Sequence, residues 1–190
     1  MKPIAIDMAY KSLNHYGEEL CGDKVEIVEK EDSRILILAD GMGSGIRANI
    51  LATLTSKIIA TMMYNDMSID EVVATIAKTL PLSSVNGVAY STFSIIQVYY
   101  TGEIYVVEYD NPECILVRQG KVKALPFSYR KIEGKKIREC RFQTLPGDAL
   151  AIMSDGCLYC GTGDIMNYRW DWNALAGCCE SSAAKTRTAA

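Results

Sequence analysis

Two Asp-Gly pairs follow aliphatic runs at distant points of the chain. Asp40 and Gly41 come directly after ILILA, and Asp155 and Gly156 come after ALAIMS. If the two predicted strands lie side by side, both carboxylates emerge at one sheet edge, where like charges are costly unless a cation neutralises them. Carboxylate oxygens favour Mg²⁺ or Mn²⁺, and a glycine lets its own carbonyl approach the ion. The pattern is therefore typical of a divalent metal site.

The same dipeptide has an ordinary structural explanation. A single Asp-Gly pair after a strand is more often a tight turn than a metal ligand. A third acid, Asp23, follows Gly22 at the entrance to another predicted strand. With this addition, spacing alone gives the metal hypothesis about the same weight as the turn hypothesis.

The glycine-rich stretch after Asp40 offers a different chemistry. The sequence GMGSG at 41–45 leads into a predicted helix, where free backbone amides could hold a phosphate. It lacks the lysine of a P-loop and does not match the G-x-G-x-x-G dinucleotide pattern, so nucleotide binding is a minor hypothesis. Ser44 is expected to cap this helix or to lie near the metal and substrate. Arg47 could contact a substrate phosphate, although a solvated surface arginine is the more common outcome.

The composition limits the classes of function. The chain has 190 residues, of which 49% are hydrophobic and 23% charged, and this suits one globular domain. A net charge of -3 without a long basic run gives little support for binding nucleic acid or a membrane surface. No apolar run approaches the ~20 residues that span a bilayer, and Asp7 interrupts any signal peptide. We expect a cytoplasmic protein.

Seven cysteines, an odd number, are scattered along the chain, which favours reduced thiols. Cys157 and Cys160 have C-x-x-C spacing, but no second such pair follows and His15 is the only histidine. We therefore interpret the cysteines mainly as small buried apolar residues rather than as zinc or redox ligands.

Hydrophobic periodicity predicts the elements that position the acids. An amphipathic opening segment at 8–23 precedes an alternating strand at 24–30 and a fully buried strand at 33–40. From Ser44 the period changes to that of a helix. Its predicted single apolar stripe is formed by Leu51, Leu54, Ile58 and Met62.

A second helix is predicted at 68–80, with a capping box formed by Ser68 and Glu71, and Pro81 ends it. Short β runs separated by turn residues then indicate an antiparallel meander. The runs at 137–145 and 148–155 are predicted to form one more hairpin, and a loop with a short helix follows.

These elements predict an α+β layered fold. We expect residues 1–180 to form a single domain and residues 181–190 to be a disordered tail or an expression-derived remnant, because this segment has no apolar period.

The motifs resemble those of SpoIIE-type bacterial serine/threonine phosphatases, a branch of the metal-dependent PPM (type 2C) family. The sequence LADGMGSGIRA resembles the family signature, and CGDKVEI resembles its first acidic motif. AYSTFSII, AIMSDGCLY and YDNPECILVRQGKV resemble its central strand, its later Asp-Gly motif and the hairpin between them. The order and spacing match over about residues 15–160.

The resemblance implies a PPM-type four-layer sandwich, with two antiparallel β-sheets flanked by α-helices, that holds two Mn²⁺ or Mg²⁺ ions. Asp40 would bridge both ions, and the carbonyl of Gly41 would contact one of them. Asp155 would bind the other ion, and Asp23 would hold it directly or through water. A water between the ions would attack phosphorus in line, without a covalent intermediate.

The C-terminal part departs from the family pattern. Family members usually carry a further acidic pair before Thr on a last strand, and this chain has no such motif. Asp164, in GTGDI, would have to take the place of that ligand from a loop, or the ligand is absent. A missing carboxylate predicts a weakly held first ion and lower activity.

By resemblance, the expected substrate is phosphoserine or phosphothreonine on a bacterial regulatory protein, such as an anti-sigma-factor antagonist or a stressosome component. An alternative is a catalytically weakened module that keeps the fold and binds a phosphorylated partner. Trp170 and Trp172 could form an edge where a partner docks, although packing against the sheet is the more ordinary role.

Overall fold

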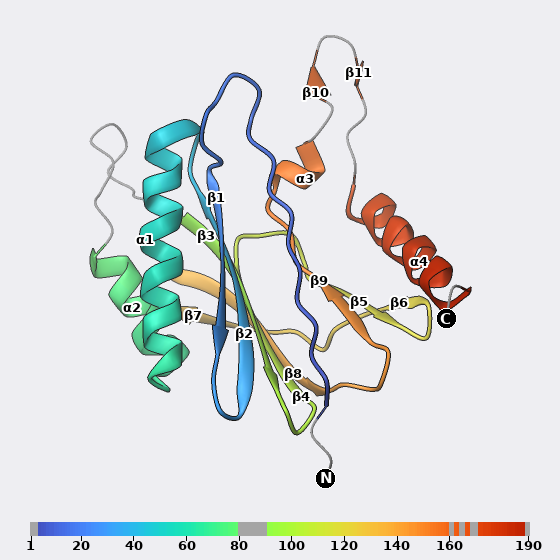
Figure 1. The fold of residues 1–190 in the computed structure, drawn as a ribbon. Coiled ribbons are helices and arrows are strands. Elements are labelled where there is room, and N and C mark those ends of the chain that lie inside the picture. Colours follow the sequence, from blue (N-terminus) through green and yellow to red (C-terminus); the bar gives the residue numbers. More distant parts are fainter. Residues whose placement is uncertain (1–3, 80–90, 160–161, 164–165, 168–170, 189–190) are drawn as a thin grey trace.

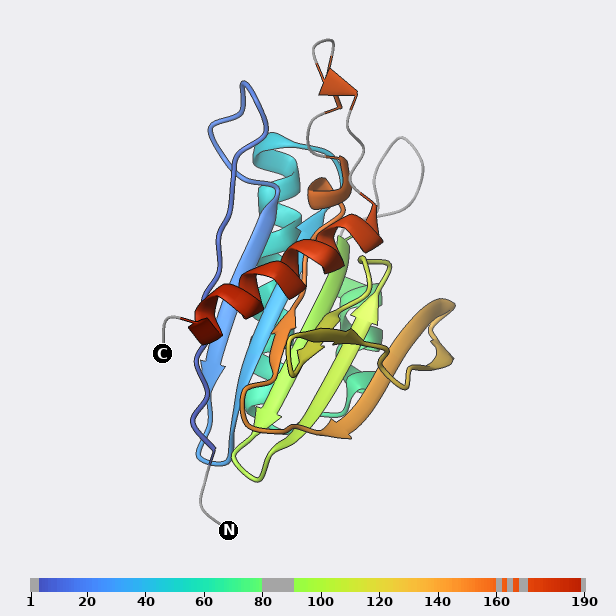
Figure 2. The ribbon, with the colours of Figure 1, turned by 90° about the vertical axis from the view of Figure 1, so that its right-hand side faces the viewer.

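The computed structural model describes residues 4–79, 91–159, 162–163, 166–167 and 171–188, and these residues form four layers (Figure 1). Helices α1 (Gly45–Tyr64) and α2 (Ile69–Thr79) cover one face of a large sheet. A small sheet covers the other face, and helix α4 (Trp172–Thr188) packs outside it (Figure 2). The predicted α+β sandwich of two antiparallel sheets flanked by helices is confirmed.

The large sheet is antiparallel and has the strand order β1-β2-β3-β4-β8-β7. Its strands are β1 (Asp23–Glu29), β2 (Ser33–Gly41), β3 (Ser91–Tyr99), β4 (Glu103–Tyr109), β8 (Lys135–Gln143) and β7 (Ser128–Ile132). The strands predicted at 24–30 and 33–40 are therefore confirmed as β1 and β2.

The small sheet has the order β6-β5-β9, and its strands are β6 (Lys121–Lys123), β5 (Ile115–Arg118) and β9 (Ala149–Ala151). A short helix α3 (Gly156–Tyr159) and a two-stranded ribbon of β10 (Thr162–Gly163) and β11 (Met166–Asn167) follow.

Side-chain alternation in the central strands joins the layers. In β3, Phe93 and Ile95 pack with the helices, whereas Ile96 and Val98 pack with the small sheet. A third cluster joins β5 to α4 through Ile115, Val117 and Ala176. Strand β3 is therefore buried on both faces, although Ser91, Ser94 and Gln97 interrupt its apolar residues.

The predicted hairpin of 137–145 with 148–155 was wrong. Strand β8 pairs with β4 and β7 in the large sheet, and β9 pairs with β5 in the small one. The turn between β8 and β9 therefore carries the chain from one sheet to the other. Asp148 fixes this turn, because its carboxylate accepts hydrogen bonds from the Leu145 N–H (2.9 Å) and from the guanidinium of Arg118.

Helix α1 buries a different face from the one that its aliphatic spacing predicts. Its buried residues are Gly45, Ala48, Ala52, Thr55, Ser56, Ile59 and Met63. Leu54, predicted in the buried stripe, is 43% exposed, and Leu51, Ile58 and Met62 are half-buried. Small residues let the first half of the helix approach the sheet closely, whereas Ile59 and Met63 fill the contact in its second half.

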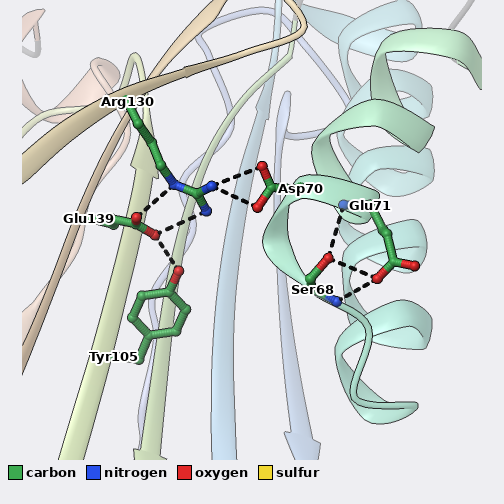
Figure 3. A network of polar contacts seen from close by, with 6 residues as sticks. All are labelled: Ser68, Asp70, Glu71, Tyr105, Arg130 and Glu139. Carbon is green, nitrogen blue, oxygen red and sulfur yellow. Dashed lines mark hydrogen bonds and ion pairs between the residues drawn. The ribbon is translucent and has the colours of Figure 1, made fainter.

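Helix α2 begins with the predicted capping box. The N–H of Ser68 donates to the Glu71 carboxylate at 2.9 Å, and the Glu71 N–H donates back to the Ser68 hydroxyl at 3.4 Å (Figure 3). Beside this cap, Arg130 of β7 lies between Asp70 of α2 and Glu139 of β8 and forms ion pairs with both at 2.6 Å (Figure 3). The Arg130 network thus attaches α2 to the edge of the large sheet.

Two terminal regions differ from the expectations. Within the described part of the opening segment, residues 4–22 contain no helix or strand. At the other end, α4 continues through Thr188, into the segment that we had expected to be a disordered tail or an expression-derived remnant. Trp172 packs against the small sheet, and its indole N–H donates to the Glu113 carbonyl at 2.8 Å, whereas Trp170 lies outside the described residues.

Candidate metal centre

Asp23 and Asp40 lie directly opposite each other at one end of the β1–β2 pair. The first residue of β1 is thereby aligned with the end of β2, so an acid that enters one strand meets an acid that leaves the next. The Gly41 N–H also donates to the Gly22 carbonyl at 3.1 Å, which keeps the two chain ends together.

Asp155 reaches the same place from the other sheet. It follows β9 and stands in the turn before α3. Ser154 beside it donates a hydrogen bond to the Asp23 carboxylate at 2.7 Å. The sequence hypothesis placed β2 and β9 side by side, but the two strands belong to different sheets. The carboxylates converge because these sheets stack face to face.

Asp40 lies at the centre of this convergence. Burial, and then the negative charges of Asp23 and Asp155, raise the pKa of the Asp40 carboxyl to about 8. Both neighbours also lie within hydrogen-bonding reach of Asp40. Carboxylates this close favour a shared proton or a cation between them, which is the chemistry of a divalent metal site.

Polar side chains of β3 and the β4–β5 loop support the end of β2. Ser91 donates its hydroxyl to the Asp40 carbonyl at 2.8 Å, and Thr92 lies opposite Asp40 in the sheet. Thr92 in turn bonds to Asn111, whose amide donates to the Ser94 hydroxyl at 3.1 Å. The supporting roles of these residues and of Ser154 were not predicted from the sequence. The small polar residues in AYSTFSII, within an otherwise apolar strand, are the feature that could have indicated them.

The glycines of GMGSG have separate structural reasons. Gly43 and Gly45 have φ values of +93° and +69°, a region that other residues rarely adopt. Position 41 requires a residue without a side chain, because a Cβ there would lie 2.0 Å from the Ala48 carbonyl oxygen. The first turn of α1 thus rests on the backbone of the residue that follows Asp40.

Ser44 and Arg47 differ in how well they match their predicted roles. Ser44 is the N-cap residue of α1, but its hydroxyl makes no cap bond and instead donates to Glu18 at 2.9 Å. Arg47 is exposed, and among the described residues it has no ion pair. It therefore remains available to an anion.

The donor set is partial in the part of the chain that the structure describes. There, no group of three or more His, Cys, Asp or Glu side chains is arranged so that it could hold a metal ion. Asp40 is nevertheless flanked by two carboxylates, and their crowding suits a divalent cation. Asp164, the predicted additional ligand, lies outside the described residues.

This geometry can be compared with solved structures. The RsbU and RsbW domains of a Mycobacterium tuberculosis protein give a TM-score of 0.70 at 17% identity, over 92% of this chain and 50% of that one. The PP2C phosphatase domain of SpoIIE from Bacillus subtilis, solved with a fragment of its regulatory domain, gives 0.68 at 19% identity, over 94% and 56%. RsbX in complex with magnesium gives 0.62 at 19% identity, over 94% and 85%.

The fold is thus that of PP2C phosphatase domains, and the chain spans about half the length of the first two structures that it matches. The model of the family described as Stage II sporulation protein E (SpoIIE) matches residues 30–178. The chain belongs to the SpoIIE family, as its motifs predicted. No curated protein matches it, and none of its described helices is long and apolar enough to cross a bilayer.

Proposed function

We propose that this protein is a protein serine/threonine phosphatase that removes phosphate from a regulatory partner protein and depends on two Mn²⁺ or Mg²⁺ ions. The observation that carries the proposal is the convergence of Asp23 and Asp155 on the half-buried Asp40, in a chain of the SpoIIE family. The magnesium in the structure of RsbX supports the choice of ion.

The chain's own residues have distinct roles in this proposal. Asp40 would hold both ions, the carbonyl of Gly41 would contact one, Asp155 would hold the other, and Asp23 would contribute directly or through water. When bound, such ions lower the pKa of a water that attacks phosphorus and stabilise the charge that develops. Ser154 and Ser91 would keep the carboxylate of Asp23 and the backbone of Asp40 in place.

Arg47 and Ser44 are proposed to lie on the substrate side of the centre. Arg47 has no ion pair in the described part of the chain, so its guanidinium could donate charge-assisted hydrogen bonds to a phosphate oxygen. Asp164 remains the proposed additional ligand of the first ion. We also retain the sequence prediction that the protein is cytoplasmic. Its proposed partner is a phosphorylated anti-sigma-factor antagonist or stressosome-type protein, and this is supported by the RsbU domain and by a structure from the bacterial stressosome that matches with a TM-score of 0.64 at 18% identity.

Hydrolysis of p-nitrophenyl phosphate tests this function. We expect phosphate release that requires Mn²⁺ and falls at least about a hundredfold in Asp40→Asn and in Asp155→Asn. Glu133→Gln, on an exposed turn, removes the same charge and should keep full activity. Equal activity of all four proteins would contradict the proposal.

The partial donor set favours one alternative. A domain that keeps the fold but holds its first ion weakly would bind a phosphorylated partner without efficient turnover. Binding of a phosphoserine peptide in saturating Mn²⁺, with no release of phosphate, would support this alternative over the enzyme. Calorimetric titration with Mn²⁺ distinguishes the two further, because two tight sites would argue for a complete centre.

A further inference from the structure

Helix α1 presents large aliphatic side chains to the outside. Ile46, Ile50 and Leu54 are 67%, 51% and 43% exposed, and we call these three residues the outer stripe of α1. Their spacing of four residues places them on one face of the helix. The opposite face, which contacts the sheet, consists mostly of small residues.

Other exposed apolar side chains lie in the segments that adjoin the start of α1. Met42, in the loop before α1, is 55% exposed, and Leu13 and Tyr16 of the opening segment are 78% and 100% exposed. This segment is fixed beside the start of α1, because Asn49 donates to the Cys21 carbonyl at 2.8 Å and Ser44 donates to Glu18. Exposed large apolar side chains on adjoining segments are a common mark of an interaction surface.

The position and charge of this surface indicate what binds there. The stripe begins five residues after Gly41, next to the carboxylates of the candidate metal centre. Arg47 lies beside Ile46 and Ile50 at the start of the helix and has no acidic partner in the described part of the chain. An apolar surface with one available cation complements an apolar segment that carries a phosphate.

A second copy of this chain is a poorer match for the same surface. Helix α1 contains no acidic residue, so a two-fold axis through the stripe would bring two Arg47 side chains together with no counter-charge supplied by the helix itself. Like charges that face each other across an interface disfavour association.

We propose that the outer stripe of α1 is the docking surface for the phosphorylated partner protein, which binds through aliphatic side chains next to its phosphorylated residue. This inference rests on the proposed phosphatase function, because it assigns the stripe to the same substrate. The metal centre would act on the phosphate group, and the stripe would select the protein that carries it.

Two synthetic phosphoserine peptides of equal length and charge test the proposal, one with leucines on either side of the phosphoserine and one with serines there. The double variant Ile46→Gln/Ile50→Gln removes the apolar side chains and keeps good helix formers. Leu145→Gln, at a 46% exposed leucine in the β8–β9 turn, is the matched control. Circular dichroism confirms that each variant is folded.

We expect the unmodified protein and Leu145→Gln to hydrolyse the leucine peptide at least about fivefold more efficiently, in kcat/KM, than the serine peptide. Ile46→Gln/Ile50→Gln should lose this preference while hydrolysing p-nitrophenyl phosphate at the normal rate. Equal preference in the double variant would overturn the docking surface, even with phosphatase activity intact.

Direct binding separates this proposal from the phosphatase proposal. Fluorescence anisotropy with a labelled leucine peptide measures docking in a protein that lacks turnover, so absence of hydrolysis would count against the phosphatase alone. We expect binding to weaken at least about fivefold in the double variant and not in Leu145→Gln. A dimer in light scattering that Ile46→Gln/Ile50→Gln dissociates would overturn the proposal, because a second copy would then cover the stripe.

Discussion

At the scale of single residues, the candidate centre depends on Asp40 more than on its neighbours. It is the acid whose pKa burial and two adjacent carboxylates raise to about 8, and its carbonyl is fixed by Ser91. A group in this position destabilises the fold through charge crowding and gains most from a cation. Such a loss of stability is expected at a functional site, because binding of the cation compensates for the charge repulsion.

Asp40→Asn should therefore separate stability from metal binding. Loss of the crowded charge should raise the melting temperature of protein kept in EDTA by about 2–4 °C, which corresponds to about 1 kcal/mol for a chain of this size. Mn²⁺ should raise the melting temperature of the unmodified protein and not that of the variant. Differential scanning fluorimetry measures both effects, with Glu133→Gln as the charge-matched control; a normal Mn²⁺ shift in Asp40→Asn would contradict the assignment.

Gly41 tests the close contact between β2 and α1. A Cβ at this position would lie 2.0 Å from the Ala48 carbonyl oxygen, so Gly41→Ala must displace the first turn of the helix. We expect a loss of about 2 kcal/mol or more in the free energy of unfolding. Gly177→Ala in α4 meets no atom within 4 Å and should be neutral or slightly stabilising in the same urea titration. An unchanged stability in Gly41→Ala would show that the two elements can separate without cost.

At the scale of elements, the sequence predicted strands and helices better than it predicted their faces and partners. The alternation in β1 and the capping box of α2 are local signals, and both predictions are confirmed. The buried face of α1 was misjudged because packing against a sheet selects small residues, whereas periodicity counts large ones. Strand β7 was missed since only one of its five residues is buried, so it lacks an apolar pattern.

Helix α2 should depend on the Arg130 network for its attachment to the sheet. Arg130→Gln removes the ion pairs with Asp70 and Glu139, so that Asp70 loses its ion pair and Glu139 keeps only the hydrogen bond from the Tyr105 hydroxyl (Figure 3). Because Arg130 is partly exposed, we expect a loss of only about 1 kcal/mol in the free energy of unfolding, with faster amide exchange in α2.

Lys121→Gln is the control for this network. Its ion pair with Glu180 joins β6 to α4 on the other side of the large sheet, and the Lys121 side chain is largely exposed, so its loss should change neither stability nor exchange in α2. Unchanged exchange in α2 of Arg130→Gln would show that apolar contacts alone hold the helix.

At the scale of the whole molecule, the site is a property of how the sheets stack. Asp23 and Asp40 come together by strand pairing, which the sequence could suggest, but Asp155 arrives from the other sheet. The acids therefore converge as predicted, but Asp155 does so through the stacking of two sheets and not through a neighbouring strand. A hairpin between the last two strands was predicted because PGD is a strong local turn signal, and no local pattern reveals that a turn changes sheets.

The turn that changes sheets should give the protein a measurable pH dependence. Burial alone would raise the pKa of Asp148, but the hydrogen bonds from Arg118, Leu145 and Thr144 outweigh it and hold the pKa below its ordinary value. An acid with a lowered folded-state pKa stabilises the fold above its unfolded-state pKa of about 3.9, and this contribution is lost as the pH falls through the lower folded-state pKa.

Asp148→Asn should therefore cost about 2 kcal/mol at pH 6, because the side chain is buried in charge-assisted bonds, and the difference from the unmodified protein should shrink below pH 4. Urea titrations of both proteins from pH 7 to pH 3 measure this convergence. Asp7→Asn is the control, since Asp7 is exposed and makes no ion pair among the described residues, so its loss should change the free energy of unfolding little at any pH. A difference between Asp148→Asn and the unmodified protein that stays constant down to pH 3 would show that the carboxylate's shape, and not its charge, holds the two sheets in register.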